Sequence, residues 1–204
     1  MQSFASQNKS AMPVVVAISG LTGSGKSAIA EQVLEKLNEN GSLGKFRYVS
    51  ASYKSVPGAM EKVLQGNADK KLANSFDDMI NREAHKGNSV VTAWLGAWLL
   101  RRDEGLNVFA VWLDAPLDVR VARKAESEMK GKDLSEIKEY IRTKDENTAE
   151  HFMKEYKIDI LEHKLIKDGG VFDMIIDTTQ DTIIGIADSI VKMVCETIDG
   201  ILAK

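Results

Sequence analysis

The chain has 204 residues, of which 44% are hydrophobic and 28% are charged, enough to build one sizeable core. Its 27 Lys and Arg against 30 Asp and Glu give a formal charge of -3, which argues against a dedicated nucleic-acid-binding protein. The single cysteine, Cys195, excludes an intramolecular disulfide and suits a reducing compartment. The longest apolar stretch, residues 93–100, is far shorter than the roughly 20 residues that span a bilayer. We therefore expect a cytoplasmic protein with no membrane partner.

Apolar runs of the buried-strand type alternate along the chain with longer stretches of helical spacing. Residues 1–13 are polar and predict a flexible tail, and residues 14–204 predict a single domain. The expected strands are Val14–Ser19, Phe46–Ser50, Ser89–Thr92, Val108–Leu113 and Phe172–Asp177. Because these runs are apolar on both sides of the pleat, we predict a doubly wound α/β sheet of parallel strands with helices on both faces.

Helices are expected between and after these strands. The apolar stripes that predict them are Ala30, Val33, Leu34 and Leu37, ending at Asn40-Gly41; Val119, Ala122 and Ala125, beginning after Pro116; and Ile183, Ala187, Ile190, Val194 and Ile198. Residues 130–157 carry many charges of both signs and few apolar side chains. Two interpretations of this segment stay open, a solvated helical excursion and a mobile flap over an active site.

Residues 20–27, Gly-Leu-Thr-Gly-Ser-Gly-Lys-Ser, match the phosphate-loop pattern G-x-x-x-x-G-K-[ST] between an apolar strand and an amphipathic helix. Glycines let backbone N–H groups converge on phosphate oxygens, and the positive end of the helix points at the same anion. Lys26 is expected to reach the β- and γ-phosphates of ATP, and Ser27 to bind Mg²⁺ as the cofactor. The predicted nucleotide-binding residues are Gly20, Leu21, Thr22, Gly23, Ser24, Gly25, Lys26, Ser27 and Ala28.

The rest of the chain narrows the class of phosphate-loop protein. Neither the D-x-x-G nor the N-K-x-D element of a GTPase occurs, and the strand SVVT continues into Ala93-Trp94 without the carboxylate that a motor ATPase needs. A small-molecule kinase fits better, because such enzymes often close a lid whose arginines neutralise the transferred phosphoryl group. Arg120 and Arg123 are three residues apart and therefore share a helix face, at the edge of the sheet where ligands bind.

The segments VVVAISGLTGSGKSAIAEQVLEKL, WLDAPLDVRVARKA, EYKIDI and FDMIIDTT resemble the nucleoside monophosphate kinases, most closely the archaeal-type cytidylate kinases, over roughly residues 14–180. The resemblance implies a three-layer P-loop kinase fold with a five-stranded parallel sheet, a helical lid at roughly residues 120–157, and transfer of the ATP γ-phosphate to CMP or dCMP. It also implies that Arg120 and Arg123 contact phosphates and that Thr178 and Thr179 flank adenine. Arg142 is either a third lid arginine or a partner of Glu139, Asp145 or Glu146.

The acceptor side departs from the family pattern. Where the family has Glu-Gly-Arg after its third strand, this chain has Thr92-Ala93-Trp94, so Trp94 either stacks on the acceptor or packs in the core with Trp98. Asp77 is either an acceptor-base contact or, with Asp78, a first-turn helix cap. The candidate acceptor residues are Ser50, Tyr53, Asp77 and Trp94.

Two functions follow from this pattern. The first is an ATP-dependent phosphotransferase acting on a nucleoside monophosphate, such as a pyrimidine monophosphate, or on a similar small acceptor. The second is an ATP-binding regulator or degenerate kinase that lacks acceptor turnover, consistent with the altered acceptor residues. The oligomeric state is not predicted by the sequence.

Overall fold

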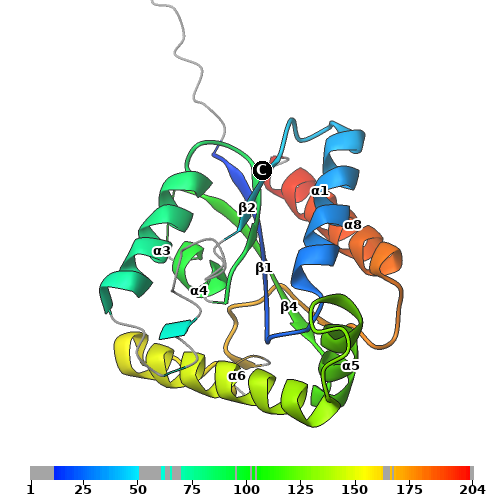
Figure 1. Cartoon of the computed structure of the whole chain (residues 1–204). Coiled ribbons are helices and arrows are strands. Elements are labelled where there is room, and N and C mark those ends of the chain that lie inside the picture. Colours follow the sequence, from blue (N-terminus) through cyan, green and yellow to red (C-terminus); the bar gives the residue numbers. More distant parts are fainter. Residues whose placement is uncertain are drawn as a thin grey trace, which may run out of the picture.

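The computed structural model describes residues 12–50, 61–62, 65, 70–94, 96–101, 103, 105–162, 166 and 168–202. Within them, helices flank both faces of a five-stranded parallel sheet, which confirms the predicted α/β fold (Figure 1). The strands are β1 (Val14–Gly20), β2 (Arg47–Ser50), β3 (Ser89–Thr92), β4 (Asn107–Asp114) and β5 (Met174–Asp177). The helices are α1 (Lys26–Asn40), α3 (Lys70–Ala84), α4 (Gly96–Leu100), α5 (Leu117–Ser127), α6 (Leu134–Tyr156) and α8 (Ile183–Leu202).

Strand β1 occupies the centre of the sheet, whose strand order is β2-β3-β1-β4-β5. It pairs in parallel with β3 on one side and with β4 on the other, so the chain reverses its direction of winding at β1. Ligands of open α/β sheets bind in the crevice at the carboxyl ends of the strands, at such a switch point. The phosphate-loop pattern directly follows β1 and is therefore placed in that crevice.

The alternation of side chains along β1 divides the core into two halves. Val16 and Ile18 pack with residues of α1 and α8 on one face of the sheet. Val15 and Ala17 pack on the other face with residues of α3 and α4. All four side chains are at most 1% exposed, which explains why the strand is a continuous apolar run rather than an alternating one.

The predicted strand positions are confirmed, with shifts of one or two residues at some beginnings and ends. The last strand begins at Met174 rather than at Phe172, and the aromatic ring of Phe172 packs instead against Trp98, with 4.9 Å between ring centroids. The predicted end of the first helix is also confirmed, since α1 ends at Asn40 and Gly41 follows with a left-handed φ of 68°. Of the predicted tail, the structure describes only Met12 and Pro13.

The helix predicted after Pro116 is present as α5, although the residues of its apolar stripe are not its most buried ones. Ala122 is exposed, and the buried side chains are Arg120, Val121 and Lys124. Val121 packs against Ile137 and Ile141 of α6 in an apolar cluster. Arg120 instead points to the loop after β1, where it is buried by the carbonyl oxygen of Thr22 and the carboxylate of Asp145.

Helix α6 packs along the edge of the molecule below α3 and α4 and reaches α5 (Figure 1). Its Ala149 and Phe152 belong to the core beneath the sheet, and Ile137 and Ile141 are fully buried against α5. The charged segment is therefore joined to the body of the domain rather than forming a solvated excursion. Among the described residues, none of the helices combines the length and the apolar character that crossing a bilayer requires.

Two glycines with positive φ give a matched test of this packing. A Cβ at Gly20, whose φ is 150°, would lie 2.6 Å from the carbonyl oxygen of Leu113, whereas a Cβ at Gly41 would meet nothing within 4 Å. We expect Gly41→Ala to lower the free energy of unfolding by about 1 kcal/mol, from backbone strain alone. Gly20→Ala adds a steric clash and should cost about 3 kcal/mol. Urea unfolding of both variants checks this order, and equal costs would contradict it.

Candidate active site

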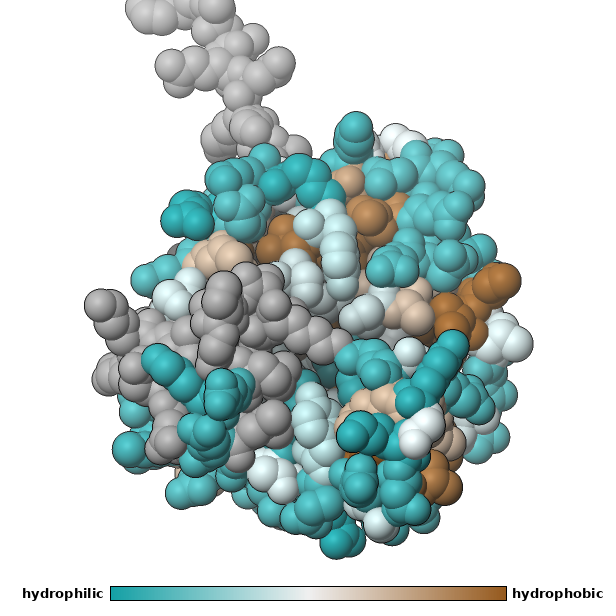
Figure 2. Space-filling view, viewed as in Figure 1, coloured by the Kyte–Doolittle hydropathy of each residue, from teal (hydrophilic) through white to brown (hydrophobic). Residues whose placement is uncertain are grey.

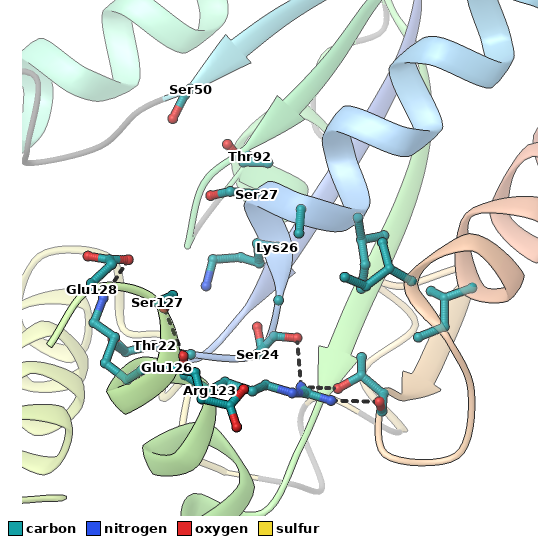
Figure 3. A pocket seen from close by; sticks show the side chains of 18 of the residues that line it. Thr22, Ser24, Lys26, Ser27, Ser50, Thr92, Arg123, Glu126, Ser127 and Glu128 are labelled. Carbon is teal, nitrogen blue, oxygen red and sulfur yellow. Dashed lines mark hydrogen bonds and ion pairs between the residues drawn. The ribbon is translucent and has the colours of Figure 1, made fainter. Parts of the chain in front are cut away.

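A cavity of about 560 Å³ opens at the carboxyl edge of the sheet, in front of the loop that joins β1 to α1 (Figure 3). Loop residues 22–29 form its floor, and α5, α6, the ends of β2 and β3, and the beginning of α8 form its walls. In the space-filling view, the apolar side chains at the right edge lie over the beginning of α8, where Ile183 and Ile184 are exposed (Figure 2). The cavity thus lies where the switch point of the sheet predicts a ligand site.

The loop from Gly20 to Ser27 wraps tightly at the foot of the cavity. Gly23 and Gly25 have φ values of 82° and 94°, in the left-handed region that side chains disfavour, and Gly25 is the N-cap residue of α1. The first turn of α1 is therefore directed at the cavity, and the unpaired N–H groups of a helix N-terminus favour an anion there.

Lys26 holds its ammonium group inside the loop. Its Nζ donates to the carbonyl oxygens of Gly20 (2.6 Å) and Leu21 (2.8 Å) and lies 5.5 Å from the centre of the Trp94 ring. Burial, and after it the positive charge of Lys144, lower the pKa of Lys26 to about 7. A polyphosphate entering the cavity would relieve this electrostatic strain.

Basic side chains from three helices line the cavity: Lys26, Arg123, Lys124 and Lys144. Arg123 donates to the hydroxyl (2.8 Å) and to the carbonyl oxygen (2.7 Å) of Thr178, which fixes its guanidinium at the rim (Figure 3). Lys124 pairs with Glu128 at 2.7 Å. Three carboxylates share these walls, those of Glu126, Glu128 and Asp181.

Two of the predicted acceptor residues, Ser50 and Trp94, line the same cavity, together with Thr92 at the end of β3. Trp94 fits both of its interpretations, because it is partly buried against the core and also borders the cavity. Trp94 packs against the core cluster that contains Trp98, and the Trp98 ring itself contacts the rings of Trp112 and Phe172.

Asp77 lies on α3, outside the cavity lining, and accepts a hydrogen bond from the hydroxyl of Tyr156 on α6. Burial raises the pKa of this carboxyl group. Its interpretation as a helix cap was wrong, because α3 begins at Lys70 and Asp77 lies in the middle of the helix. Tyr53, the remaining predicted acceptor residue, falls outside the described residues.

The structure separates the three arginines that the sequence grouped together. Arg123 borders the cavity, Arg120 is buried beneath the loop and paired with Asp145, and Arg142 is exposed on α6 away from the cavity lining. Asp145, one of the partners expected for Arg142, pairs with Arg120 at 2.6 Å. Of the two threonines after β5, Thr178 lines the cavity and Thr179 lies outside its lining.

Lys124, Lys144 and Asp145 were missed as site residues. Lys144 is spaced by three residues from Ile141 and by seven from Ile137, so it continues the buried stripe of α6. A lysine on an apolar stripe is a signal, because lysine is almost never fully buried without a partner or a function. Lys124 follows Arg120 by four residues and therefore shares its helix face.

The lowered pKa of Lys26 predicts how anion binding depends on pH. In the free protein, Lys26 largely loses its proton as the pH rises above 7. A bound triphosphate would raise the pKa of Lys26, so binding above pH 7 takes up a proton. We expect the affinity for inorganic tripolyphosphate to fall as pH rises from 7.5 to 9, by up to about tenfold per pH unit. Titration calorimetry in buffers of different ionisation enthalpy measures the uptake. Lys26→Arg stays charged over this range and should make the affinity nearly independent of pH. A wild-type affinity that does not change with pH would contradict the prediction.

Comparison with known proteins shows the family of the chain. Residues 39–180 match the model of the cytidylate kinase-like family. The chain is 27% identical to the cytidylate kinase of Methanocaldococcus jannaschii over 180 residues, covering 85% of this chain and 93% of that protein. It is 31% identical to the cytidylate kinase of Ignicoccus hospitalis over 171 residues, covering 80% of this chain and 89% of that protein.

Solved structures support the fold independently. A gluconokinase from Sinorhizobium meliloti superposes with a TM-score of 0.63 at 15% identity, covering 94% of this chain and 97% of that one. A shikimate kinase from Acinetobacter baumannii superposes with a TM-score of 0.56 at 13% identity, covering 92% and 95%. At these identities the likeness concerns the fold alone. The sequence matches, however, extend over most of the chain, and the protein belongs to the cytidylate kinase-like family of P-loop kinases.

Proposed function

We propose that the protein transfers the γ-phosphoryl group of ATP to a nucleoside monophosphate or a similar small acceptor. The observation that carries this proposal is one shared cavity, in which the phosphate loop with its basic side chains faces the wall made by Ser50, Thr92 and Trp94. A donor triphosphate and an acceptor would meet there side by side. Family membership supports a kinase-like nucleotide phosphotransferase.

The residues of the loop would act by positioning and charge neutralisation. In-line phosphoryl transfer needs little covalent chemistry from the protein, and catalysis comes from holding donor and acceptor in line and stabilising negative charge. Lys26 would leave its two carbonyl partners and donate to the β- and γ-phosphates. Arg123, fixed by Thr178 at the rim, would neutralise charge on the transferred group, with Lys124 and Lys144 beside it.

The donor set fits Mg²⁺ bound together with ATP. No group of three or more His, Cys, Asp or Glu within the described part of the chain is arranged to hold a metal ion. Mg²⁺ commonly takes few protein ligands and completes its shell with phosphate oxygens and water, so the cavity-lining hydroxyl of Ser27 would be its protein ligand. When bound, the ion would offset the negative charge of the phosphates.

A pyrimidine monophosphate is the acceptor that the relatives suggest, since those compared above are cytidylate kinases. The hydroxyl groups of Ser50 and Thr92 could donate to the acceptor, and the indole of Trp94 could stack on its ring. Thr92 is itself held by the hydroxyl of Tyr48, at 3.0 Å.

The second candidate is a regulator that binds ATP without acceptor turnover. One observation favours it: Trp94 stands on the acceptor wall at the position where the resembled family has an arginine. Loss of that cation removes a bidentate partner for an acceptor phosphate.

The decisive experiment is ADP production by the purified protein with Mg·ATP and CMP, dCMP, UMP, AMP, GMP or TMP. We expect stimulation by a pyrimidine monophosphate, and Lys26→Ala should lower the rate by at least about 100-fold because it removes a charge from the transition state. Full activity of Lys26→Ala would refute the proposed role of the loop. ATP binding without stimulation by any of the six would favour the regulator.

Trp94 gives a separate prediction about the acceptor. We expect Trp94→Ala to raise the KM for the acceptor about tenfold through loss of a stacking contact, while the KM for ATP changes less than about threefold. Steady-state kinetics with each substrate varied in turn measure this split. Trp98→Phe, a substitution in the core behind the cavity, is the control and should leave both constants near wild type. An unchanged acceptor KM in Trp94→Ala would show that the indole serves only packing.

A further inference from the structure

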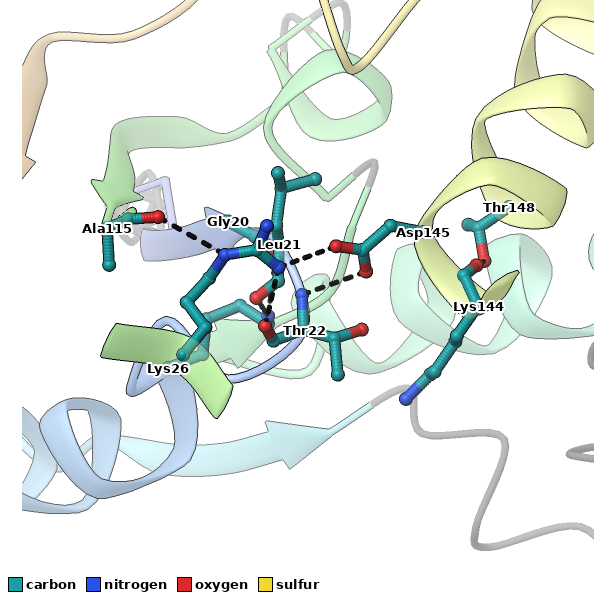
Figure 4. A network of polar contacts seen from close by, with 9 residues as sticks. Gly20, Leu21, Thr22, Lys26, Ala115, Lys144, Asp145 and Thr148 are labelled. Carbon is teal, nitrogen blue, oxygen red and sulfur yellow. Dashed lines mark hydrogen bonds and ion pairs between the residues drawn. The ribbon is translucent and has the colours of Figure 1, made fainter. Parts of the chain in front are cut away.

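Thr22, the third residue of the phosphate loop, has both of its backbone polar groups held by side chains from other elements. Its N–H donates to Oδ1 of Asp145 on α6 at 3.2 Å, and its carbonyl oxygen accepts from Nη1 of Arg120 on α5 at 2.9 Å. The same Nη1 lies 2.6 Å from Oδ2 of Asp145, so the three residues form one closed network (Figure 4).

The network is buried and well satisfied. The side chains of Arg120 and Asp145 are 8% and 5% exposed, and Nε of Arg120 donates to the carbonyl oxygen of Ala115 at 3.2 Å. Removing two charges from water is costly unless their remaining hydrogen-bonding groups find partners, as most of them do here. Next to the network, a Cβ on Gly23 would lie 2.8 Å from the carbonyl oxygen of Arg120, so the backbone of α5 rests directly on the loop.

Lys144 precedes Asp145 on α6 and serves a different surface. Consecutive helical residues point about 100° apart, so Asp145 faces the network while Lys144 extends away from it (Figure 4). Lys144 is 8% exposed and lines the cavity, and its carbonyl oxygen accepts from the hydroxyl of Thr148 at 2.7 Å. Lys144 and Lys26 line the same cavity, and the positive charge of Lys144 contributes to the lowered pKa of Lys26.

We propose that Asp145 is a positioning residue: by pairing with Arg120 and Thr22 it fastens α6 to the phosphate loop, so that Lys144 binds the donor triphosphate in the cavity. The inference rests on the proposed function, because it takes a polyphosphate as the ligand. Arg120 then acts on the loop and on α6, and the phosphate-binding cation that α6 supplies is Lys144.

A double-mutant cycle tests the coupling. Asp145→Asn, Lys144→Met and the double variant are compared with wild type by calorimetric titration with inorganic tripolyphosphate and with Mg·ATP. We expect each single substitution to weaken binding about tenfold, and the double variant to be little weaker than either, because both changes remove the same contact. Lys144→Arg keeps the charge and should retain most of the affinity.

The chain offers a matched control. Asp118 on α5 and Lys138 on α6 form an ion pair at 2.9 Å that joins the same two helices, but it is exposed and touches neither the loop nor the cavity. Asp118→Asn should leave both affinities unchanged. The positioning role would be overturned if the effects of Asp145→Asn and Lys144→Met on binding were additive. It would also be overturned if Asp145→Asn bound with wild-type affinity while Lys144→Met bound more weakly, even where Asp145→Asn lowers the melting temperature.

A second variant keeps the test valid if Asp145→Asn does not fold because Arg120 is left as an unpaired buried charge. Arg120→Met combined with Asp145→Leu removes both charges together. We expect this variant to bind tripolyphosphate about tenfold more weakly, like Lys144→Met, and wild-type affinity would overturn the inference. Turnover separates this inference from the proposed function. If the variants show the coupled loss of binding but the wild-type protein phosphorylates no acceptor, the positioning role stands and the proposed kinase function is refuted.

Discussion

The burial of β1 on both faces is the constraint on which the rest of the structure depends. Val15 and Ala17 face one half of the core, and Val16 and Ile18 face the other, so the strand can lie only at the centre of a covered sheet. A central strand flanked by β3 and β4 creates the switch point, and the loop that leaves it emerges in the crevice. The phosphate loop is therefore placed by packing, before any ligand contributes.

The site itself concentrates positive charge where the fold has removed water. Lys26 and Lys144 line the same cavity, and burial together with the charge of Lys144 lowers the pKa of Lys26 to about 7, an arrangement that costs stability in the free protein. Such a cost is expected at a binding site, because an anionic ligand that fills the cavity recovers it as binding free energy. The Trp94 ring beside the Lys26 ammonium adds a weaker attraction and joins the donor and acceptor walls.

Helix α6 links the charged segment of the chain to this site. Its apolar side chains anchor it at both ends, Ile137 and Ile141 against α5 and Phe152 in the main core. Between these anchors lie Lys144 and Asp145, one directed to the cavity and one to the loop. A helix held in this way can carry a cation into the site with little freedom to move, which is what electrostatic stabilisation of a charged transition state requires.

Local patterns in the sequence determined the strands, the end of α1 at Asn40, the phosphate loop and the kinase class, because each depends on neighbouring residues: alternation, helical spacing, glycine torsions or a contiguous motif. Contacts between distant segments were decided only by tertiary structure. Arg120 and Arg123 are equivalent in helical spacing, yet one lies beneath the loop and the other at the rim. Asp145 accepts a hydrogen bond from the backbone N–H of Thr22, which is 123 residues away in the sequence, and nothing in the local pattern around Asp145 indicates that partner. Burial of a charged side chain depends on which elements pack around it, so only the folded chain separates the cations of the cavity from those that hold the loop in place.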